Sequence, residues 1–340
     1  MLVKRSLYLF FIVWWSYTIS MNPKAEFALI LAVAFVLPIA SFFIFSSYFE
    51  KKYAWPDTPL ATFVEKKKTT EPISLLFVGD IMLDRTIRKD GEAQGYAELF
   101  SCLPDMFAGY DEVIGNLEGT VTNYTSVSRD ASYQAPESFR FTFDIAGVKA
   151  LVDTGLSIVS IGNNHIRDYG DAGIAQTVAN LDTLDVPHFG DPRPGVKRYT
   201  VQDVKGTKIA LIAYNEFFGT PEQTLSDLAA ASLESDMQVI FPHWGDEYVP
   251  PRANIKQLAR TFVDAGADLI IGAHPHVIQE SETYKEVPIY YSLGNFIFDQ
   301  YWEPAVSTGM MVNITIADGK ITDQKEILVE SKRHAGTCLK

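Results

Sequence analysis

Six short apolar runs in this chain end in the same way, with a glycine or proline turn beside a carboxylate, carboxamide or imidazole. The polar residues at these run ends are, in order, Asp80; Asn116 and Glu118; Asn163, Asn164 and His165; His243; His274 and His276; and Asn295. Short apolar runs that alternate with amphipathic helical stretches are typical of α/β domains, which present ligands at the carboxyl edge of the sheet. The pattern therefore predicts an α/β domain with one polar site at its strand ends.

The apolar runs and the periodic stretches between them give the expected elements. Strands are predicted at residues 73–78, 112–114, 158–161, 208–213, 239–241, 269–271 and 288–291, and helices at residues 146–153, 173–184 and 255–265. Residues 310–316 and 321–328, joined by an Asp318-Gly319 turn, predict a β-hairpin. Residues 123–140 are expected to form a long surface loop at a substrate rim.

The N-terminal part is predicted to be a membrane anchor rather than part of this domain. Residues 27–49 carry no charge, and a helix of this length is long enough to cross a hydrocarbon layer of about 30 Å. Residues 6–20 are a shorter apolar stretch that is either a second span or an extension upstream of a true start at Met21. The expected organisation is an anchor at 1–49, a linker at 50–71, the α/β domain at 72–330 and a tail at 331–340.

Charge and cysteine content narrow the classes of function. The formal net charge is −13, and residues 1–69 hold eight Lys and Arg against four Asp and Glu, which leaves 21 basic and 38 acidic residues for 70–340. So acidic a domain argues against a nucleic-acid groove, which needs a basic footprint. The two cysteines, Cys102 and Cys338, could pair, but they form neither a disulfide framework nor a thiolate metal site.

The His274-Pro275-His276 element is the least ordinary of the six run ends. Four of the six histidines of the chain follow such runs, and the proline fixes the backbone between two imidazoles without offering a donor of its own. A single Gly-Asp or Asn-Asn after a strand is usually a simple turn. Taken together, the six ends favour a centre for one or two divalent ions, because such centres need several oxygen and nitrogen ligands on rigid supports.

At this point the order of the motifs resembles the CapA (PgsA-type) poly-γ-glutamate capsule synthesis family, a branch of the calcineurin-like metallophosphoesterase superfamily. The resemblance covers about residues 73–300 and rests on six blocks. They are Gly79-Asp80-Ile81-Met82-Leu83, Gly115-Asn116-Leu117-Glu118-Gly119, Asn163-Asn164-His165-Ile166-Arg167-Asp168-Tyr169-Gly170, His243-Trp244-Gly245-Asp246-Glu247-Tyr248, Gly272-Ala273-His274-Pro275-His276-Val277 and Tyr291-Ser292-Leu293-Gly294-Asn295-Phe296-Ile297-Phe298-Asp299-Gln300.

The resemblance implies a four-layer α-β-β-α metallophosphatase-like sandwich with Mn, Fe or Zn ions at the strand ends. One ion would be held by Asp80, Glu118 and His276. Glu118 would bridge to a second ion, whose other ligands would be Asn164, His243 and His274.

The same resemblance implies roles for the remaining site residues. His165 would act as acid or electrostatic stabiliser beside the leaving group, oriented by Asp168. A substrate pocket would be lined by Asn116, Asn163, Glu247, Asn295 and Asp299.

Two positions depart from the wider superfamily. Its first motif usually has a histidine two residues after the aspartate, where this chain has Met82, so the first ion would lose a ligand. Glu118 stands where the superfamily usually has aspartate, as in the CapA branch.

Three functions follow from this interpretation. The first is a membrane-anchored, metal-dependent hydrolase or transferase that acts on an anionic polymer or ester at the cell envelope, with a metal-activated water and with its domain outside the cytoplasm. In the CapA context the polymer would be poly-γ-glutamate, and the ester alternative is a phosphoester. The second is a non-catalytic subunit that works with other capsule synthesis subunits in polymer synthesis or export. The third is a general phosphoesterase, which Met82 disfavours.

Overall fold

The protein is described by a computed structural model, which covers residues 71–132 and 135–340. The predicted spans at 6–20 and 27–49, and the linker at 50–71 except its last residue, lie outside these residues. No helix in the described part of the chain has the length and apolar character needed to cross a membrane. The described residues fall into one compact unit from Lys68 to Lys340.

The first of two large sheets carries the N-terminal half of the site. Its strand order is β16-β15-β14-β1-β2-β5-β6, with β13 also paired to β1, and β1, β2, β5, β6 and β13 run parallel. The strands are β1 (Ile73–Ile81), β2 (Glu112–Leu117), β5 (Ile158–Ser160), β6 (His188–Phe189), β13 (Asn295–Ile297), β14 (Thr308–Ala317), β15 (Lys320–Lys332) and β16 (Gly336–Leu339). Parallel pairing directs the carboxyl ends of β1, β2 and β5 to one edge.

The second sheet carries the histidines of the C-terminal half. Its order is β11-β12-β10-β9-β8-β7, in which β8, β9, β10 and β12 are parallel and both outer strands are antiparallel. The strands are β7 (Tyr199–Val204), β8 (Thr207–Asn215), β9 (Met237–His243), β10 (Leu269–Ile271), β11 (Ser281–Tyr284) and β12 (Val287–Tyr290). A small pair, β3 (Thr120–Val121) and β4 (Thr142–Phe143), stands apart from both sheets.

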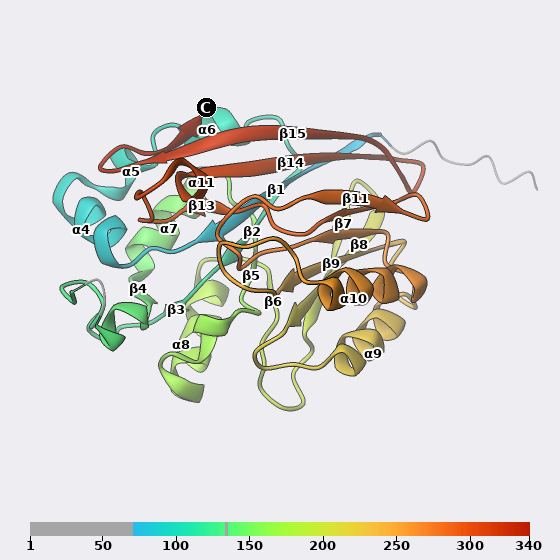
Figure 1. Cartoon of the computed structure of the whole chain (residues 1–340), viewed down its shortest axis with the longest axis horizontal. Helices are drawn as coiled ribbons and strands as arrows, with labels where there is room; N and C mark the ends of the chain where they lie inside the picture. Colours follow the sequence, from blue (N-terminus) through green and yellow to red (C-terminus); the bar gives the residue numbers. More distant parts are fainter. Residues whose placement is uncertain (1–70, 133–134) are drawn as a thin grey trace, which may run out of the picture. The chain divides into compact units, whose positions relative to one another are not determined.

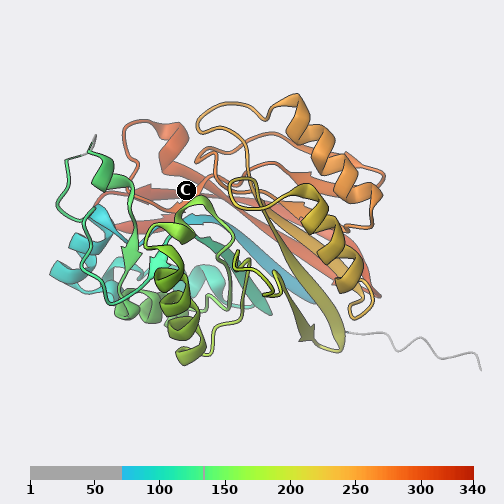
Figure 2. The same cartoon turned by 90° about the horizontal axis from the view of Figure 1, so that it is seen from below.

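The helices lie on the outer faces of the two sheets, so that the described unit has four layers (Figures 1 and 2). The helices are α4 (Arg85–Gln94), α5 (Tyr96–Leu99), α6 (Leu103–Phe107), α7 (Ile145–Asp153), α8 (Gly170–Thr183), α9 (Pro221–Ala231), α10 (Ala253–Asp264) and α11 (Pro304–Ser307), with 3-10 turns η2 (Pro136–Phe139) and η3 (Asn164–Arg167). In Figure 2, α7 and α8 lie on one side of the sheets and α9 and α10 on the other.

Three buried hydrophobic clusters hold these layers together. One joins the first sheet to the helices from α4 to α8, and one joins the second sheet to α9 and α10. The third lies between the sheets, where Phe77 and Ile114 of the first pack with Leu211, Val239 and Leu269 of the second. A strand buried on both faces must be apolar throughout, which explains why the central strands appear in the sequence as continuous apolar runs. The predicted α-β-β-α layering is therefore seen directly.

Local signals account for the element ends. Thr220 and Gln223 form a reciprocal capping box at the start of α9, and the Asp144 side chain accepts from the Gly147 amide at the start of α7. Asp318 and Gly319 have φ of 53° and 70°, which is the left-handed pair that a two-residue hairpin turn requires.

The predicted strands, helices and hairpin are confirmed, with shifts at their ends. β1 and β2 continue to Ile81 and Leu117, so Asp80 belongs to a strand rather than to the turn after it. The predicted domain end at residue 330 falls inside β15, and the residues predicted as a tail include β16. Cys102 and Cys338 form a disulfide that ties the start of α6 to β16. This covalent link makes the C-terminal residues part of the domain.

Candidate metal centre

The carboxyl ends of strands from both sheets meet at one place. In the first sheet, Asp80 of β1 is level with Asn116 of β2 and with Asn295 of β13. In the second, His243 at the end of β9 is bridged to Ala273, next to His274. The Asp80 carboxylate accepts a hydrogen bond from the His274 backbone amide at 3.1 Å, which joins the two sheets directly.

Close backbone contact makes this junction possible. The Asp80 amide donates to the Gly294 carbonyl at 3.0 Å, and a Cβ on Gly79 would lie only 1.9 Å from that oxygen. Only glycine fits at position 79, because any side chain there would push β1 away from the segment before β13.

Glu118 is the centre of the site. It is fully buried, and neither carboxylate oxygen has a hydrogen-bond partner. Its Oε1 lies 3.7 Å from His243 Nε2, 3.8 Å from His276 Nε2 and 3.9 Å from His165 Nε2. A buried carboxylate without partners is costly, so a site of this kind calls for a cation between the carboxylate and the imidazoles.

The pKa of Glu118 reflects this environment. Burial first, and then the negative charges of Asp80 and Glu247, raise it well above its usual range. A bound divalent cation would reverse that shift, because it favours the charged carboxylate.

Two of the buried histidines near Glu118, His243 and His274, are held neutral. Burial, followed by the charge of His274, lowers the pKa of His243 well below its usual value. Burial, followed by the charge of His276, lowers the pKa of His274 to about 3. Neutral imidazoles are the form that binds metals, and His274 Nδ1 is buried with no hydrogen-bond partner.

The His274-Pro275-His276 segment adopts an unusual backbone. His274 has φ of 99° and His276 has φ of 57°, both in the left-handed region that non-glycine residues rarely occupy. Such conformations cost free energy and concentrate at functional sites. The strain turns both imidazoles toward Glu118, in a group of three whose ligand atoms all lie within 4.8 Å of one another.

A second group with the same spacing contains Asp80, Glu118 and His243. Glu118 is common to both groups, as expected for a bridging ligand. Both predicted partner pairs are also close together: His276 Nδ1 lies 3.4 Å from Asp80 Oδ2, and the ring centroids of His243 and His274 lie 4.7 Å apart. The division of the ligands between two ions stays a prediction. Carboxylate and imidazole donors of this type suit a divalent ion, and the atoms of Glu118 and His274 that lack hydrogen-bond partners fit such an ion.

Asn164 lies in the 3-10 turn η3, which follows β5 of the first sheet. Its Oδ1 lies 2.8 Å from His243 Nε2, so the predicted ligand pair is brought together. Asn116 and Asn163 are both buried and hydrogen-bonded. The Asn116 amide donates to Asp80 Oδ1 at 2.8 Å and also lies 3.2 Å from His243 Nδ1, and Asn163 donates to Asn116 Oδ1 at 3.1 Å. These amides orient the candidate ligands.

His165 and Asp168 form a pair at the edge of the centre. His165 Nδ1 lies 2.8 Å from Asp168 Oδ2, which leaves Nε2 directed to Glu118. The Phe141 ring packs on the His165 imidazole with 4.2 Å between centroids, and the Phe141 amide donates to Asp168 at 2.7 Å. A carboxylate that fixes one ring nitrogen leaves the other ready to give or take a proton.

The other predicted pocket residues have different positions. Asn295 Oδ1 lies 3.0 Å from His276 Nδ1 and orients that imidazole. Asp299 pairs with the buried Arg85 guanidinium and accepts a hydrogen bond from the Thr86 amide. Glu247 is exposed, and its negative charge contributes to the raised pKa of Glu118.

Arg85 was not among the predicted site residues. Its guanidinium lies between the rings of Phe141 and Phe298, at 5.0 and 5.5 Å, and its positive charge lowers the pKa of Glu118. Arg85 lies two residues after Leu83, where the first family block ends, and no local pattern marks it.

Met82 occupies the position at which the superfamily motif usually has a histidine. Its side chain is fully buried in the hydrophobic cluster between the first sheet and its helices, and its sulfur accepts from the Asp84 amide at 3.0 Å. The residue packs in the core, and the centre is built without a side chain from this position.

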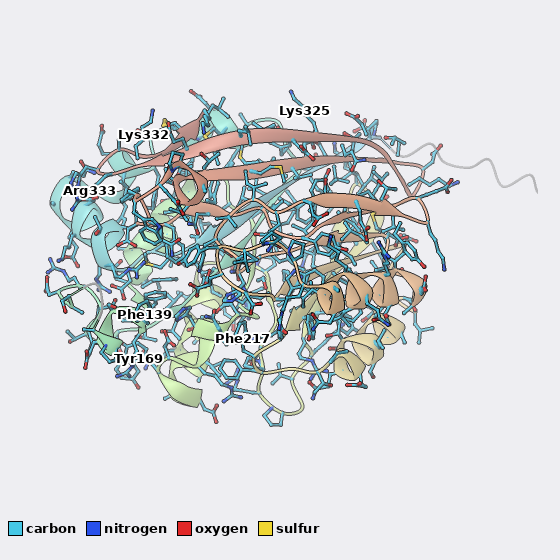
Figure 3. All side chains as sticks on the ribbon, in the orientation of Figure 1. Phe139, Tyr169, Phe217, Lys325, Lys332 and Arg333 are labelled. Atoms are coloured by element: carbon cyan, nitrogen blue, oxygen red, sulfur yellow. A yellow bond between two sulfur atoms is a disulfide. The ribbon has the colours of Figure 1, made fainter. Side chains whose placement is uncertain are left out.

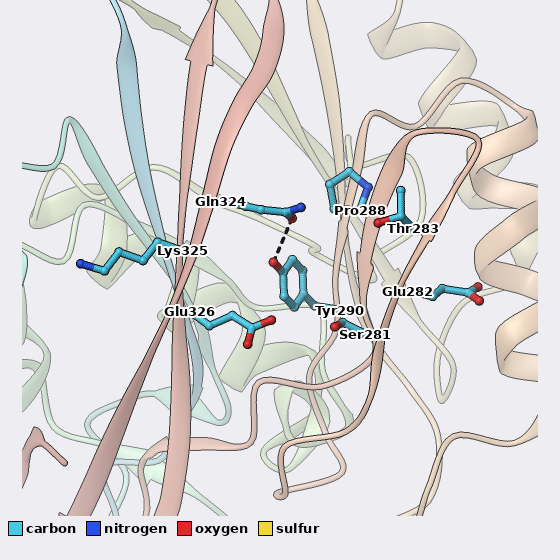
Figure 4. Close-up of a pocket in the computed structure, with 8 residues that line it drawn as sticks. All are labelled: Ser281, Glu282, Thr283, Pro288, Tyr290, Gln324, Lys325 and Glu326. Atoms are coloured by element: carbon cyan, nitrogen blue, oxygen red, sulfur yellow. Dashed lines mark hydrogen bonds between the residues drawn. The ribbon is translucent and has the colours of Figure 1, made fainter.

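Two exposed aromatic side chains, Phe217 and Tyr248, lie beside the histidines of the centre. Phe217 lies 4.8 Å from the His274 ring, and Tyr248 lies 6.0 Å from the His276 ring. In Figure 3, Phe217 is labelled near the middle of the view, and Phe139 and Tyr169 are labelled to its left. A separate groove of about 550 Å³ lies between β11, β12 and β15 (Figure 4), and none of its lining residues is a candidate ligand.

Comparison with known proteins decides the family. The model of the family described as bacterial capsule synthesis protein PGA_cap matches residues 74–300. This chain belongs to that family. The predicted CapA membership is thus confirmed, and the PGA_cap match contains every candidate ligand described above.

Two relatives of this PGA_cap chain are named for capsule or PGA biosynthesis. The "PGA biosynthesis protein CapA" of Bacillus subtilis is 33% identical over 70% of this chain and 66% of its own length. The "Capsule biosynthesis protein CapA" of Bacillus anthracis is 29% identical over 79% of this chain and 69% of its own. The match therefore spans about two thirds of these relatives. A solved phosphatase structure from Mycoplasma pneumoniae aligns with 78% of this chain and 96% of its own, at 14% identity and a TM-score of 0.48.

Proposed function

We propose that this PGA_cap protein is a metal-dependent hydrolase that acts on an anionic polymer at the cell envelope. The observation that carries the proposal is Glu118, a buried carboxylate whose two oxygens have no hydrogen-bond partner and whose Oε1 lies 3.7, 3.8 and 3.9 Å from three imidazole nitrogens. The names of the two Bacillus relatives support poly-γ-glutamate as the polymer.

The residues divide into holding and proton-transfer roles. Asp80, Glu118, Asn164, His243, His274 and His276 would hold one or two divalent ions. When bound, such an ion supplies a hydroxide from water near neutral pH and polarises the bond under attack. His165 would deliver a proton to the leaving group from Nε2, while Asp168 holds Nδ1.

We place the domain outside the cytoplasm, anchored by residues 27–49. The Cys102–Cys338 disulfide supports this location, because disulfides persist in oxidising compartments. The uncharged length of residues 27–49 supports the anchor.

One observation favours a second candidate, a non-catalytic subunit of a polymer synthesis or export complex. Met82 is buried in the core, so the centre lacks the histidine that the superfamily usually supplies there. In that case a bound ion would hold structure or polymer without cleavage.

The test combines elemental analysis with a screen of phosphoesters and γ-glutamyl amides on the full chain. The hydrolase proposal expects bound Mn, Fe or Zn and a turnover that the His165→Ala variant loses. Absence of metal from the purified protein would overturn it. Metal without turnover, together with normal polymer yield in cells that carry His165→Ala, would favour the subunit.

A further inference from the structure

Arg140 is an exposed arginine that is nevertheless held in one position. Its Nη2 donates to the Asp168 carbonyl at 3.2 Å, and its guanidinium lies 4.9 Å from the centre of the Tyr169 ring. These two contacts reduce the conformational freedom that an exposed arginine usually has to lose on binding.

The charge of Arg140 is not neutralised by a carboxylate within the described residues, since none lies at ion-pair distance from it. Other surface arginines differ: Arg167 pairs with Asp171, and Arg260 pairs with Glu282. Asp168 uses one of the five N–H groups of Arg140, which leaves a fork that matches a carboxylate.

Arg140 lies beside the proton-transfer pair of the metal centre. The carbonyl that it contacts belongs to Asp168, whose side chain holds His165, which in turn lies 3.9 Å from Glu118. The next residue, Phe141, packs on the His165 ring. A group bound at Arg140 would therefore be a neighbour of the group bound at the centre.

The acidic surface of the protein means that binding of an anionic substrate needs a fixed positive charge such as Arg140. Residues 70–340 carry 21 basic against 38 acidic residues, and the negative charge of the exposed Glu247 contributes to the raised pKa of Glu118. A polyanion would be repelled by this surface unless a fixed positive charge lay at its path.

We propose that Arg140 binds a carboxylate of an extended polycarboxylate chain, next to the unit that occupies the metal centre. This subsite deepens the proposed function and depends on it for the identity of the polymer. It concerns binding alone, so it holds whether or not the bond at the centre is cleaved.

The test measures binding of a fluorescently labelled oligo-γ-glutamate to the metal-loaded full chain by anisotropy. Arg140→Gln is expected to weaken binding about tenfold at low salt, and Arg140→Lys less, because lysine keeps the charge but not the fork. Arg260→Gln is the matched control, since Arg260 is also exposed and lies 5.5 Å from a tyrosine ring. It should bind like wild type, and the Arg140 effect should shrink at about 0.5 M salt.

Each result has a defined meaning. Equal binding by wild type and Arg140→Gln overturns the subsite, as does absence of binding by wild type, or an equal loss in Arg260→Gln. Binding that depends on Arg140 without any hydrolysis supports the subsite while it counts against the hydrolase proposal, so the two can fail separately.

Discussion

Replacement of Glu118 by glutamine should stabilise the metal-free protein and destabilise the metal-loaded one. Glutamine has nearly the same shape as glutamate but carries no charge. In the absence of metal it removes the cost of a buried carboxylate whose two oxygens have no partner. With metal present, it removes the ligand that is common to both candidate groups.

The magnitude follows from burial. A fully buried, unsatisfied polar group costs about 1–3 kcal/mol and a charged one costs more, so removal of the charge should stabilise the metal-free variant by about 2 kcal/mol. For a domain of this size that is about 4 °C in melting temperature. Metal at about 100 times its dissociation constant would stabilise wild type by about 2.7 kcal/mol, which reverses the order.

The pH dependence has a defined sign. Burial and the neighbouring charges raise the pKa of Glu118 above its usual value of 4.5, so the folded state holds a proton that the unfolded chain releases. The metal-free wild type should therefore lose stability, relative to Glu118→Gln, as the pH rises above 4.5. His243 and His274 have lowered pKa values, so their effect on stability has the opposite sign. Through them, the folded protein loses stability as the pH falls below 6.5. Comparison of the two proteins at each pH separates the contribution of Glu118.

The assay is thermal unfolding of both proteins in chelator and in excess manganese or zinc, at several pH values. Glu98→Gln serves as control, because Glu98 is exposed in the short helix α5. It should follow wild type in every condition. The reasoning is refuted if Glu118→Gln is less stable than wild type in chelator, or if the variant binds metal as tightly as wild type does.

Three further predictions concern other parts of the molecule. Reduction of the Cys102–Cys338 disulfide, or its replacement by serines, should cost about 4–5 kcal/mol because it closes a loop with a sequence separation of 236; identical melting of the oxidised and reduced proteins would contradict this. His165→Ala should lower any hydrolytic rate at least about a hundredfold and leave the metal content of the protein unchanged, so loss of metal would assign His165 as a ligand instead. Gly79→Ala should destabilise the protein by about 3 kcal/mol, measured by denaturant unfolding, because the new Cβ would lie 1.9 Å from the Gly294 carbonyl; wild-type stability would show that β1 can move there.

Much of the fold could be predicted because its signals are local. The central strands are buried on both faces and so appear as apolar runs, as in β1, and the Asp318-Gly319 pair marks its hairpin. Element ends were less certain, since β1 and β2 gain their last residues from pairing with neighbouring strands. Pairing of Cys102 with Cys338 could not be decided from two cysteines alone.

The site was predicted as a set of residues but not as a set of contacts. Asn116 was assigned to a substrate pocket, yet its amide lies between Asp80 and His243 as a buried support. Asp299 was assigned to the same pocket, yet it holds Arg85. An exposed and a buried amide look alike in sequence, because burial depends on what packs above the residue.

The sequence by itself determined the alternating elements, their order and the polar residues that end the strands, since each depends on neighbours a few residues away. Only the tertiary structure decided which of these residues meet. The His274 amide and the Asp80 carboxylate are 194 residues apart in the chain, and their contact exists because two separate sheets pack face to face. That packing also leaves Glu118 buried among imidazoles with no partner, and this is the physical reason to expect a metal there.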